Sequence, residues 1–288
     1  MHRILILVHE SEPPPEEWQF LISSLNRAWE QRGIVAMIAH GTTRVIDADV
    51  IVNHVDLTIT PKAYRAYLRR YPVAINGSLL DIAKDRFSDN LLAPGDTYQG
   101  KVIVKTKINA GGRHELELAA QSSFAGRLAY RRAWGRTSGR RAALGSRTHY
   151  FNDGRYPVFD SVQEVPPGVW RNKRLVVEKL LSEREGDHFV LRSWYFLGSR
   201  SFNVRLLSVV PVVKGPDIMA REVLADTVPA EVRRVREALG ADYGRIDYAI
   251  VDGVPVVYDI NRTPSTTPGA RERYRSELAH IARGIDDF

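Results

Sequence analysis

The chain has 288 residues, a length at which about two domains and a substantial hydrophobic core are expected. Hydrophobic residues make up 44% and charged residues 26%, close to the average of globular proteins, which excludes collagen, coiled-coil and disordered classes for the whole chain. The net charge is +7, and the absence of cysteine excludes disulfides, thiolate nucleophiles and cysteine-based metal sites.

The first 75 residues alternate between short apolar runs and amphipathic segments. Apolar runs bounded by charged residues are typical of buried parallel strands, and apolar residues at helical spacing indicate helices. We predict strands at 3–8, 34–39, 50–54 and 72–75, and helices at 13–33 and 61–70. This alternation predicts an open parallel sheet with helices on its faces.

Beyond residue 80 the pattern changes to neighbouring strands with fewer helices. We predict strands at 101–105, 176–181, 189–197, 201–213, 243–251 and 254–260, and helices at 229–239 and 270–283. Asp252 and Gly253 form a turn signal between two strand patterns, which predicts a hairpin. The chain therefore divides into an N-terminal α/β domain, 1–90, and a larger α+β domain, 91–288.

One segment carries a local excess of positive charge. Between residues 118 and 152 there is no Asp or Glu, and there are seven arginines: Arg127, Arg131, Arg132, Arg136, Arg140, Arg141 and Arg147. The rest of the chain is balanced, since 41 basic less 34 acidic residues leaves a difference of seven. We expect this insertion to face an anion, with a solvated loop as the alternative, and we do not expect a nucleic-acid partner.

The predicted hairpin carries three candidate metal ligands. Asp247 lies on its first strand, and Asp259 and Asn261 lie two residues apart on its second, so that these two share a face. Carboxylate and amide oxygens suit Mg²⁺, or Mn²⁺ in its place. The alternative is that all three are solvent-facing residues of an amphipathic hairpin.

Residues 244–264, which contain these ligands, resemble the metal-binding hairpin of the ATP-grasp superfamily. The usual closing motif of that hairpin is Glu, one apolar residue, Asn and then Pro. Here Asp259 stands where Glu is typical, and its shorter reach puts the usual bridging of two Mg²⁺ ions in question. The resemblance implies that Asp247, Asp259 and Asn261 hold Mg²⁺.

Two upstream segments resemble nucleotide-binding parts of the same superfamily. Residues 101–113 resemble its strand with a terminal lysine that contacts the α and β phosphates, followed by a flexible glycine-rich loop that covers them. The resemblance implies these roles for Lys105 and for Gly111 and Gly112, with a simple turn as the alternative. Residues 75–84 resemble the entry to the grasp domain and imply that Lys84, on a helix, is the first nucleotide-binding lysine. The alternative for Lys84 is an ordinary surface lysine.

Residues 175–181 resemble the interdomain hinge that reads the adenine edge. The resemblance implies that the Glu178 side chain and the backbone of Lys179 and Leu180 bind the base. The alternative is an edge strand with outward charges. A ribose ligand is expected among three acids that follow: Glu183, Glu185 and Asp187.

Residues 192–205 resemble the strand pair whose arginines face the γ-phosphate and the acyl phosphate. The resemblance implies that Arg192 and Arg205 are catalytic, with Lys214 as a further candidate. Guanidinium groups in a dry cleft neutralise the charge that spreads over phosphoryl oxygens. The alternative is that these arginines are exposed and pair across strands with acids.

Taken over nearly the whole chain, the resemblance implies a parallel-sheet pre-ATP-grasp domain followed by a two-subdomain ATP-grasp fold. It also implies an ATP- and Mg²⁺-dependent ligase that forms a C–N bond through an acyl phosphate. The alternatives are a kinase that phosphorylates a hydroxyl and a non-catalytic nucleotide- or polyanion-binding protein. We expect a small-molecule or peptide substrate, of anionic character. Whether the protein is a homodimer stays open.

The N-terminal apolar run is too short for a signal peptide. No stretch of the sequence approaches the roughly 18 uninterrupted apolar residues of a membrane helix. We therefore expect a cytoplasmic protein with no membrane partner.

Overall fold

The computed structural model describes residues 3–134, 156–225 and 228–288. The chain divides into two compact units. Unit 1 contains Met1–Asp81, Arg184–Ala249 and Val257–Phe288, and unit 2 contains Ile82–Glu183 and Ile250–Val256. The domain boundary expected at residue 90 stays a prediction.

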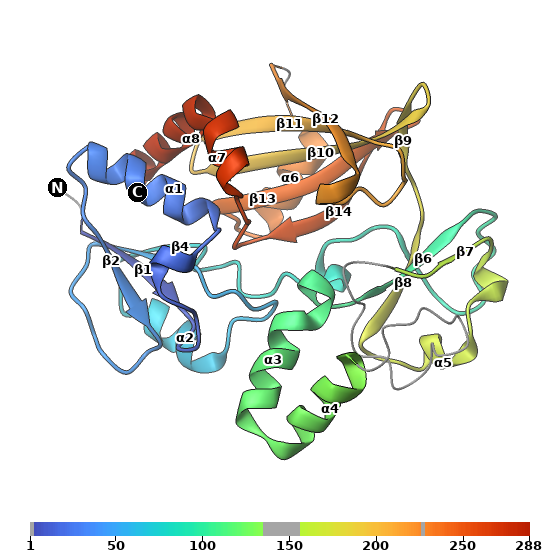
Figure 1. Cartoon of the computed structure of the whole chain (residues 1–288), viewed down its shortest axis with the longest axis horizontal. Helices are drawn as coiled ribbons and strands as arrows, with labels where there is room; N and C mark the ends of the chain where they lie inside the picture. Colours follow the sequence, from blue (N-terminus) through green and yellow to red (C-terminus); the bar gives the residue numbers. More distant parts are fainter. Residues whose placement is uncertain (1–2, 135–155, 226–227) are drawn as a thin grey trace. The chain divides into compact units, whose positions relative to one another are not determined.

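Unit 1 begins with a parallel sheet in the order β2-β1-β3-β4. Its strands are β1 (Ile4–Val8), β2 (Ala36–His40), β3 (Val50–Asn53) and β4 (Val73–Ile75). All five side chains of β1 are buried, which requires a helix on each face of the sheet. Helix α1 (Leu21–Gln31) covers one face and α2 (Lys62–Leu68) the other (Figure 1). The predicted parallel sheet is confirmed.

The first predicted helix is wrong over its N-terminal third. Residues 15–17 form a single 3₁₀ turn, η1 (Pro15–Glu17), and α1 begins only at Leu21. Between them the chain is extended, because Phe20 forms a bridge with Ser265 and the Leu21 N–H donates to the Pro264 carbonyl at 2.7 Å. A contact with the far end of the sequence therefore overrides the local helical pattern.

The second sheet, most of whose residues belong to unit 1, is antiparallel, with the strand order β12-β11-β10-β13-β14. Its strands are β10 (His188–Leu197), β11 (Arg200–Ser208), β12 (Ile218–Leu224), β13 (Tyr243–Val251) and β14 (Val254–Asn261), and β9 (Glu183–Glu185) pairs with β10. Both residues of the turn between β13 and β14 have positive φ, 50° at Asp252 and 81° at Gly253, which confirms the predicted hairpin.

Two other predicted elements of unit 1 end differently. Strand β11 stops at Ser208 rather than continuing to residue 213, and a 3₁₀ turn, η7 (Gly215–Asp217), leads into β12, which was not predicted. The helix predicted at 270–283 is two helices, α7 (Pro268–Arg273) and α8 (Arg275–Ala282), followed by η8 (Arg283–Asp287). At the break, the buried Tyr274 packs against Phe202. Helix α6 (Ala230–Ala238) forms as predicted.

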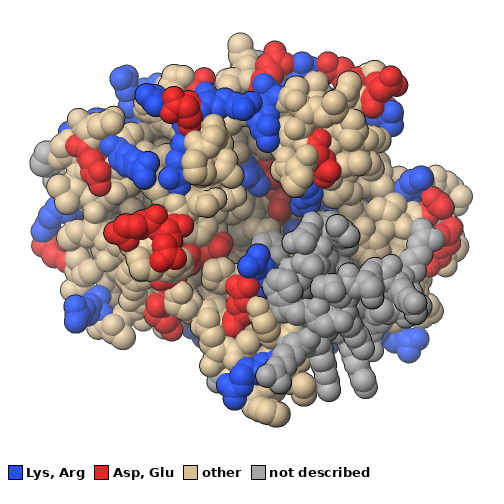
Figure 2. All heavy atoms as spheres, in the orientation of Figure 1, with Lys and Arg blue, Asp and Glu red and all other residues tan. Residues whose placement is uncertain are grey.

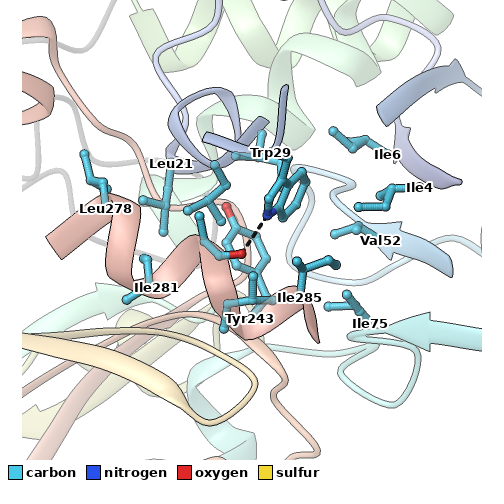
Figure 3. Close-up of a cluster of buried hydrophobic side chains, with 14 of the residues drawn as sticks. Ile4, Ile6, Leu21, Trp29, Val52, Ile75, Tyr243, Leu278, Ile281 and Ile285 are labelled. Atoms are coloured by element: carbon cyan, nitrogen blue, oxygen red, sulfur yellow. Dashed lines mark hydrogen bonds between the residues drawn. The ribbon is translucent and has the colours of Figure 1, made fainter. Parts of the chain in front are cut away.

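One hydrophobic core joins the two ends of the chain within unit 1 (Figure 3). The indole of Trp29 on α1 donates a hydrogen bond to the carbonyl of Ala282 on α8 at 2.8 Å. Around this bond lie side chains of the parallel sheet, of α1, of β13 and of the C-terminal helices: Ile4, Ile6, Val52, Ile75, Leu21, Tyr243, Leu278, Ile281 and Ile285. The parallel sheet, α1 and α8 therefore form one packed body.

A buried histidine lies at the carboxyl end of β3. The ring of His54 packs against Phe20 and Tyr243, with centroid distances of 5.0 and 6.0 Å. Burial is the main cause that lowers the pKa of His54 to about 3; Asp56 acts against this shift and Arg262 adds to it. His54 is therefore neutral in the folded protein at neutral pH.

This burial predicts a pH-dependent loss of stability. An unfolded histidine titrates near pH 6.5, so the unfolded chain binds a proton that folded His54 refuses between pH 6.5 and about 3. We expect His54 to lower the free energy of unfolding by up to about 1.4 kcal/mol per pH unit as the pH falls through this range. Urea unfolding at pH 7 to 4 would measure it, with His54→Phe as the comparison. If the free energy of unfolding fell equally with pH in the wild-type protein and in His54→Phe, the prediction would be contradicted.

Unit 2 contains a small antiparallel sheet in the order β5-β8-β6-β7. Its strands are β5 (Leu91–Leu92), β6 (Val102–Thr106), β7 (Val158–Phe159) and β8 (Leu175–Lys179). Its helices and 3₁₀ turns are η2 (Lys84–Arg86), η3 (Asn109–Gly112), α3 (Arg113–Ser122), α4 (Phe124–Trp134), η6 (Val162–Glu164) and α5 (Pro167–Trp170). Val102, Val104, Val177 and Phe159 form its core.

The described part of the arginine-rich insertion is helical. A Cβ on Gly126 of α4 would lie 1.8 Å from the carbonyl oxygen of Ala119 on α3, so the two helices meet at a distance that only glycine allows. The solvated-loop alternative is therefore wrong for residues 118–134. Residues 135–152, with Arg136, Arg140, Arg141 and Arg147, lie outside the described residues.

Positive and negative side chains are interspersed over the face that Figure 2 shows, in line with the charge balance expected outside the insertion. Among the described residues, no helix has both the length and the hydropathy that crossing a membrane requires.

Candidate functional site

Unit 2 brings together two residues that the sequence predicted for nucleotide binding. In the pairing of β6 with β8, Ile103 lies opposite Glu178 and Lys105 lies opposite Val176, so Lys105 and Glu178 are diagonal neighbours on one face. Lys105 Nζ lies 2.6 Å from Glu178 Oε2, and Ser88 Oγ donates to Glu178 Oε1 at 3.1 Å. The side chains are 13% and 3% exposed, which makes this a buried ion pair.

The position of Glu178 excludes one alternative. Strand β8 lies between β5 and β6, so it is not an edge strand, and the Glu178 carboxylate points inward. A carboxylate that accepts from both a lysine and a serine has a fixed orientation. The Lys105 ammonium and the Glu178 carboxylate therefore form an oriented cation and hydrogen-bond acceptor at the end of β6.

Lys84 lies against the residues that follow β6. It begins η2, a single 3₁₀ turn rather than the expected helix, and its side chain is 4% exposed. Its backbone N–H donates to the carbonyl of Lys107 at 3.0 Å, and Lys107 forms an ion pair with Asp85. The surface-lysine alternative for Lys84 is wrong, because the residue is buried against the end of β6.

The two predicted glycines lie where the chain turns into a helix. Gly111 and Gly112 have φ values of 69° and 81°, a left-handed backbone conformation that residues with a side chain rarely adopt. They end η3, and Gly112 is the N-cap of α3 without a side-chain cap hydrogen bond. The expected flexible loop is therefore a buried helical turn, and the first N–H groups of α3 follow it.

The backbone groups predicted to bind adenine are partly occupied. The N–H of Lys179 donates to Asn90 at 2.9 Å, and that of Leu180 donates to Lys101 at 2.8 Å. The predicted contact of these residues with a base stays a prediction, and in this structure the backbone groups left for it are the carbonyl oxygens. Two of the ribose candidates also bind elsewhere: Glu183 accepts the Ile250 N–H at 2.7 Å, and Glu185 pairs with Arg205.

Unit 1 holds the predicted metal ligands. Asp247 on β13 is 8% exposed, so the solvent-facing alternative is wrong for it. Its Oδ1 accepts from Ser193 Oγ at 2.6 Å, and its Oδ2 accepts from Arg245 at 2.8 Å. Both carboxylate oxygens are thus oriented by neighbouring groups on the same sheet face.

Arg245 is a site residue that the sequence analysis missed. It lies two residues before Asp247 on β13 and over the ring of Tyr195 at 5.8 Å. Burial lowers the pKa of Arg245, but Asp247, Tyr195 and Asp259 outweigh burial and hold that pKa above its usual value. A permanent cation therefore lies within electrostatic reach of two predicted metal ligands.

The other two ligands lie on β14. Asp259 and Asn261 alternate with Ile260 and so share a face. The Asn261 side-chain oxygen accepts the Thr263 N–H at 2.9 Å, and the Thr263 hydroxyl bonds to Asp56, which fixes the amide.

Two carboxylates and one amide oxygen fit Mg²⁺, which prefers hard oxygen donors and keeps several waters. In the described parts of the chain, no group of three or more His, Cys, Asp or Glu residues could hold a metal. A metal at this hairpin would therefore depend on Asn261 and on ligand oxygens as well.

The two arginines expected to be catalytic do not share a sheet face with the predicted metal ligand Asp247. Arg192 on β10 lies opposite Tyr248 on β13, whereas its neighbour Ser193 lies opposite Asp247. Since adjacent residues point to opposite faces, Arg192 and its cross-strand partner Arg205 lie on the face away from Asp247. Arg205 also binds Glu222, with a 2.6 Å separation, so the alternative of cross-strand pairing with acids is confirmed for Arg205.

The structure is similar to that of the ATP-grasp ligase PsnB complexed with minimal precursor, with a TM-score of 0.50 and 11% identity over 97% of this chain and 99% of that one. The chain has the ATP-grasp fold. The ATP-grasp fold predicted from the sequence is thereby supported, without a subfamily, and its division into a pre-ATP-grasp domain and two subdomains stays a prediction.

Two further solved structures are similar at lower scores. An ATP-grasp RimK domain protein from Sphaerobacter thermophilus has a TM-score of 0.48 and 12% identity, over 98% of this chain and 99% of that one. D-alanine–D-alanine ligase from Bacillus anthracis has a TM-score of 0.47 and 10% identity, over 100% and 97% of the two chains. No protein-family model and no curated protein matches the sequence.

Proposed function

We propose that this protein is an ATP- and Mg²⁺-dependent ligase that activates a carboxylate as an acyl phosphate for attack by an amine. The observation that carries the proposal is the buried Lys105–Glu178 pair within an ATP-grasp fold. PsnB, which has a similar fold, is described as a ligase.

In this proposal unit 2 binds the nucleotide. Lys105, supported by Lys84, neutralises the α and β phosphates, and the N–H groups at the start of α3 point toward phosphate oxygens. Glu178 keeps Lys105 in place and accepts a hydrogen bond from the adenine amino group. Because both partners are already oriented in the structure, binding costs little side-chain entropy.

Unit 1 supplies the acidic and cationic groups of the reaction. Asp247, Asp259 and Asn261 would hold Mg²⁺, which when bound neutralises phosphate charge and orients the γ-phosphoryl group. Arg245 takes the role expected of Arg192 and Arg205, since it lies on the face of Asp247 and stays charged. Its guanidinium group stabilises the negative charge on the transferred phosphoryl oxygens.

The reaction proceeds in two balanced steps. A carboxylate oxygen of the substrate attacks the γ-phosphorus, the bond to the bridging oxygen breaks, and ADP leaves. The nitrogen of an amine then attacks the acyl carbon, the C–O bond to phosphate breaks, and the amine loses a proton. The products are an amide, ADP and inorganic phosphate. The chain contributes positioning and charge, and no protein nucleophile is required.

We propose that the substrate is a small molecule or a peptide of anionic character. We also propose that the protein acts in the cytoplasm. Arg127, one of the arginines of the insertion, lies on α4 together with the exposed Phe124. A cation beside an exposed aromatic ring favours an acidic partner with apolar groups.

The proposal is tested first by thermal unfolding with a non-hydrolysable ATP analogue and Mg²⁺. At about one hundred times its dissociation constant a ligand stabilises the folded state by about 2.7 kcal/mol, which raises the melting temperature by several degrees. We expect the rise only when analogue and Mg²⁺ are both present. A flat response to the analogue, together with a rise on adding polyanions, would replace the ligase by a polyanion-binding protein.

Product analysis then separates a ligase from a kinase. A ligase supplied with ATP, a carboxylate and an amine releases free phosphate and ADP in equal amounts. A kinase transfers the phosphate to a hydroxyl of its acceptor, so ADP appears without free phosphate. This second result would overturn the ligase assignment and retain the nucleotide site.

A further inference from the structure

Unit 1 contains a cavity of ≈ 300 Å³ that plays no part in the proposed reaction. It is lined by residues of β10, β11, the end of β12 and α6 with the residues before it: Trp194, Ser201, Phe202, Asn203, Leu224, Ala225, Val228 and Arg233. Trp194 lies directly opposite Asn203 in the pairing of β10 with β11 and opposite Ile246 on β13. By alternation, Trp194 and Asn203 lie on the sheet face away from Asp247.

Two buried polar atoms of this cavity have no hydrogen-bond partner among the described residues. They are the indole N–H of Trp194, a donor, and the side-chain oxygen of Asn203, an acceptor. The residues are 4% and 3% exposed. An unsatisfied buried polar group costs about 1–3 kcal/mol, and native proteins contain few of them. A directly opposed donor and acceptor of this kind are suited to a ligand that completes both hydrogen bonds.

Both groups are held in place by their surroundings. The Asn203 amide nitrogen donates to the Tyr248 hydroxyl at 2.6 Å, which directs the amide oxygen away from Tyr248. The Trp194 ring packs against Phe196 at a centroid distance of 5.0 Å, and the guanidinium of Arg236 lies 5.2 Å from its centroid. The donor and the acceptor are therefore preorganised, which lowers the cost of binding.

A cation completes the lining. Arg233 is exposed on α6, and its guanidinium donates to the Val228 carbonyl at 2.6 Å, which holds it at the cavity. Leu224, Ala225 and Val228 supply apolar surface. The cavity thus combines a donor, an acceptor, a cation and an apolar wall in a volume at the lower end of the range for small-molecule sites.

We propose that this cavity binds a small carboxylic acid that also carries an amide group. An amide presents a carbonyl oxygen next to an N–H, which complements the Trp194 donor and the Asn203 acceptor. The carboxylate of the ligand binds the Arg233 guanidinium. The site lies on the opposite sheet face from Asp247, so it is separate from the proposed catalytic groups and does not depend on the proposed ligase activity.

The test follows the indole N–H resonance of Trp194 in ¹⁵N-labelled protein, assigned by its loss in Trp194→Phe. L-glutamine and N-acetylglycine, two sources of the same chemistry, are titrated against L-glutamate, which has nearly the same shape as glutamine but no amide. We expect the amide probes to shift this resonance and L-glutamate to leave it in place. The other four tryptophans report on non-specific effects.

Affinity is then compared in matched variants by titration calorimetry. Trp194→Phe removes the donor and keeps an aromatic ring, and we expect about tenfold weaker binding. Arg233→Ala removes the cation, whereas its neighbour Arg234→Ala removes an exposed arginine that pairs with Glu231 at 3.6 Å and does not line the cavity. We expect weaker binding for Arg233→Ala and unchanged binding for Arg234→Ala. If Trp194→Phe does not fold, the two arginine variants decide.

Two results would overturn the inference. One is the absence of any shift of the Trp194 resonance with either amide probe at concentrations up to about 10 mM, at which even very weak binding would be detected. The other is equal binding of L-glutamine and L-glutamate, which would show that the amide is not recognised. We expect Asp259→Ala, a variant at the proposed metal hairpin, to bind the amide probes as tightly as the wild-type protein. Failure of the ligase proposal would then be distinguishable from failure of this inference.

Discussion

Replacing Lys105 by methionine is expected to lower the free energy of unfolding by about 3–5 kcal/mol and to abolish stabilisation by nucleotide. Glu178 is 3% exposed, and in the variant its charge stays buried without the cation. The hydrogen bond from Ser88 at 3.1 Å is too little to compensate for a buried carboxylate. Urea unfolding with and without an ATP analogue and Mg²⁺ measures both effects.

A double variant separates the structural role of Lys105 from its proposed binding role. In Lys105→Met with Glu178→Gln, no charge is left buried, so we expect most of the lost stability to return. Nucleotide stabilisation should stay absent, because the phosphate-binding cation is still missing. A double variant that binds the ATP analogue with wild-type affinity would remove Lys105 from the nucleotide site.

Lys107 offers a matched control two residues away. It forms an ion pair with Asp85, and the two side chains are 36% and 35% exposed. Ion pairs that water reaches contribute about 0–1 kcal/mol, so Lys107→Met is expected to change the free energy of unfolding by no more than this. A loss as large as that of Lys105→Met would show that the effect comes from any lysine at this end of β6.

The parts of the fold that depend on local pattern were predictable from the sequence. The alternation of apolar runs and helices identified the parallel sheet, and the Asp252–Gly253 signal identified the hairpin of β13 and β14. Lys105 and Glu178 were predicted separately, and the pairing of β6 with β8 brings them into contact. Sequence order and residue type were sufficient for these features.

Features that depend on strand register were not predictable. Because successive residues of a strand face opposite sides, a shift of one residue decides whether Arg192 or Ser193 lies beside Asp247, and only the pairing of β10 with β13 settles it. Arg245 was missed because, in a chain with many arginines, its residue type gave no contrast. Its place two residues before Asp247 was the available signal.

Tertiary contacts explain most of the remaining differences. The Phe20–Ser265 bridge keeps residues before α1 extended, and the burial of Tyr274 against Phe202 separates α7 from α8. The N–H of Leu180 donates to the carbonyl of Lys101, and the sequence around Leu180 does not show this hydrogen bond. In each case the partner lies far away in the sequence, and local propensity carries no information about it.

Replacing Asp259 or Asn261 by alanine is expected to reduce turnover by more than about 100-fold, since even outer-shell partners of a metal ligand change affinity by roughly 10- to 100-fold. The fold should survive Asp259→Ala, because Asp259 is only partly buried and lies near the end of β14. We also expect the Mg²⁺ concentration needed for half of the nucleotide-induced melting shift to rise. This second readout does not require turnover.

Two further variants on the same hairpin decide whether the effect belongs to a metal ligand. Asp252→Asn removes one negative charge from the turn, where a φ of 50° suits asparagine, and it should leave the Mg²⁺ requirement unchanged. Asp259→Glu restores the residue typical of the motif and keeps a carboxylate, so activity should be retained. Full activity in both alanine variants would exclude the metal site. Loss of activity in Asp252→Asn as well would assign the effect to the charge of the hairpin as a whole, because that turn lies outside the proposed ligand set.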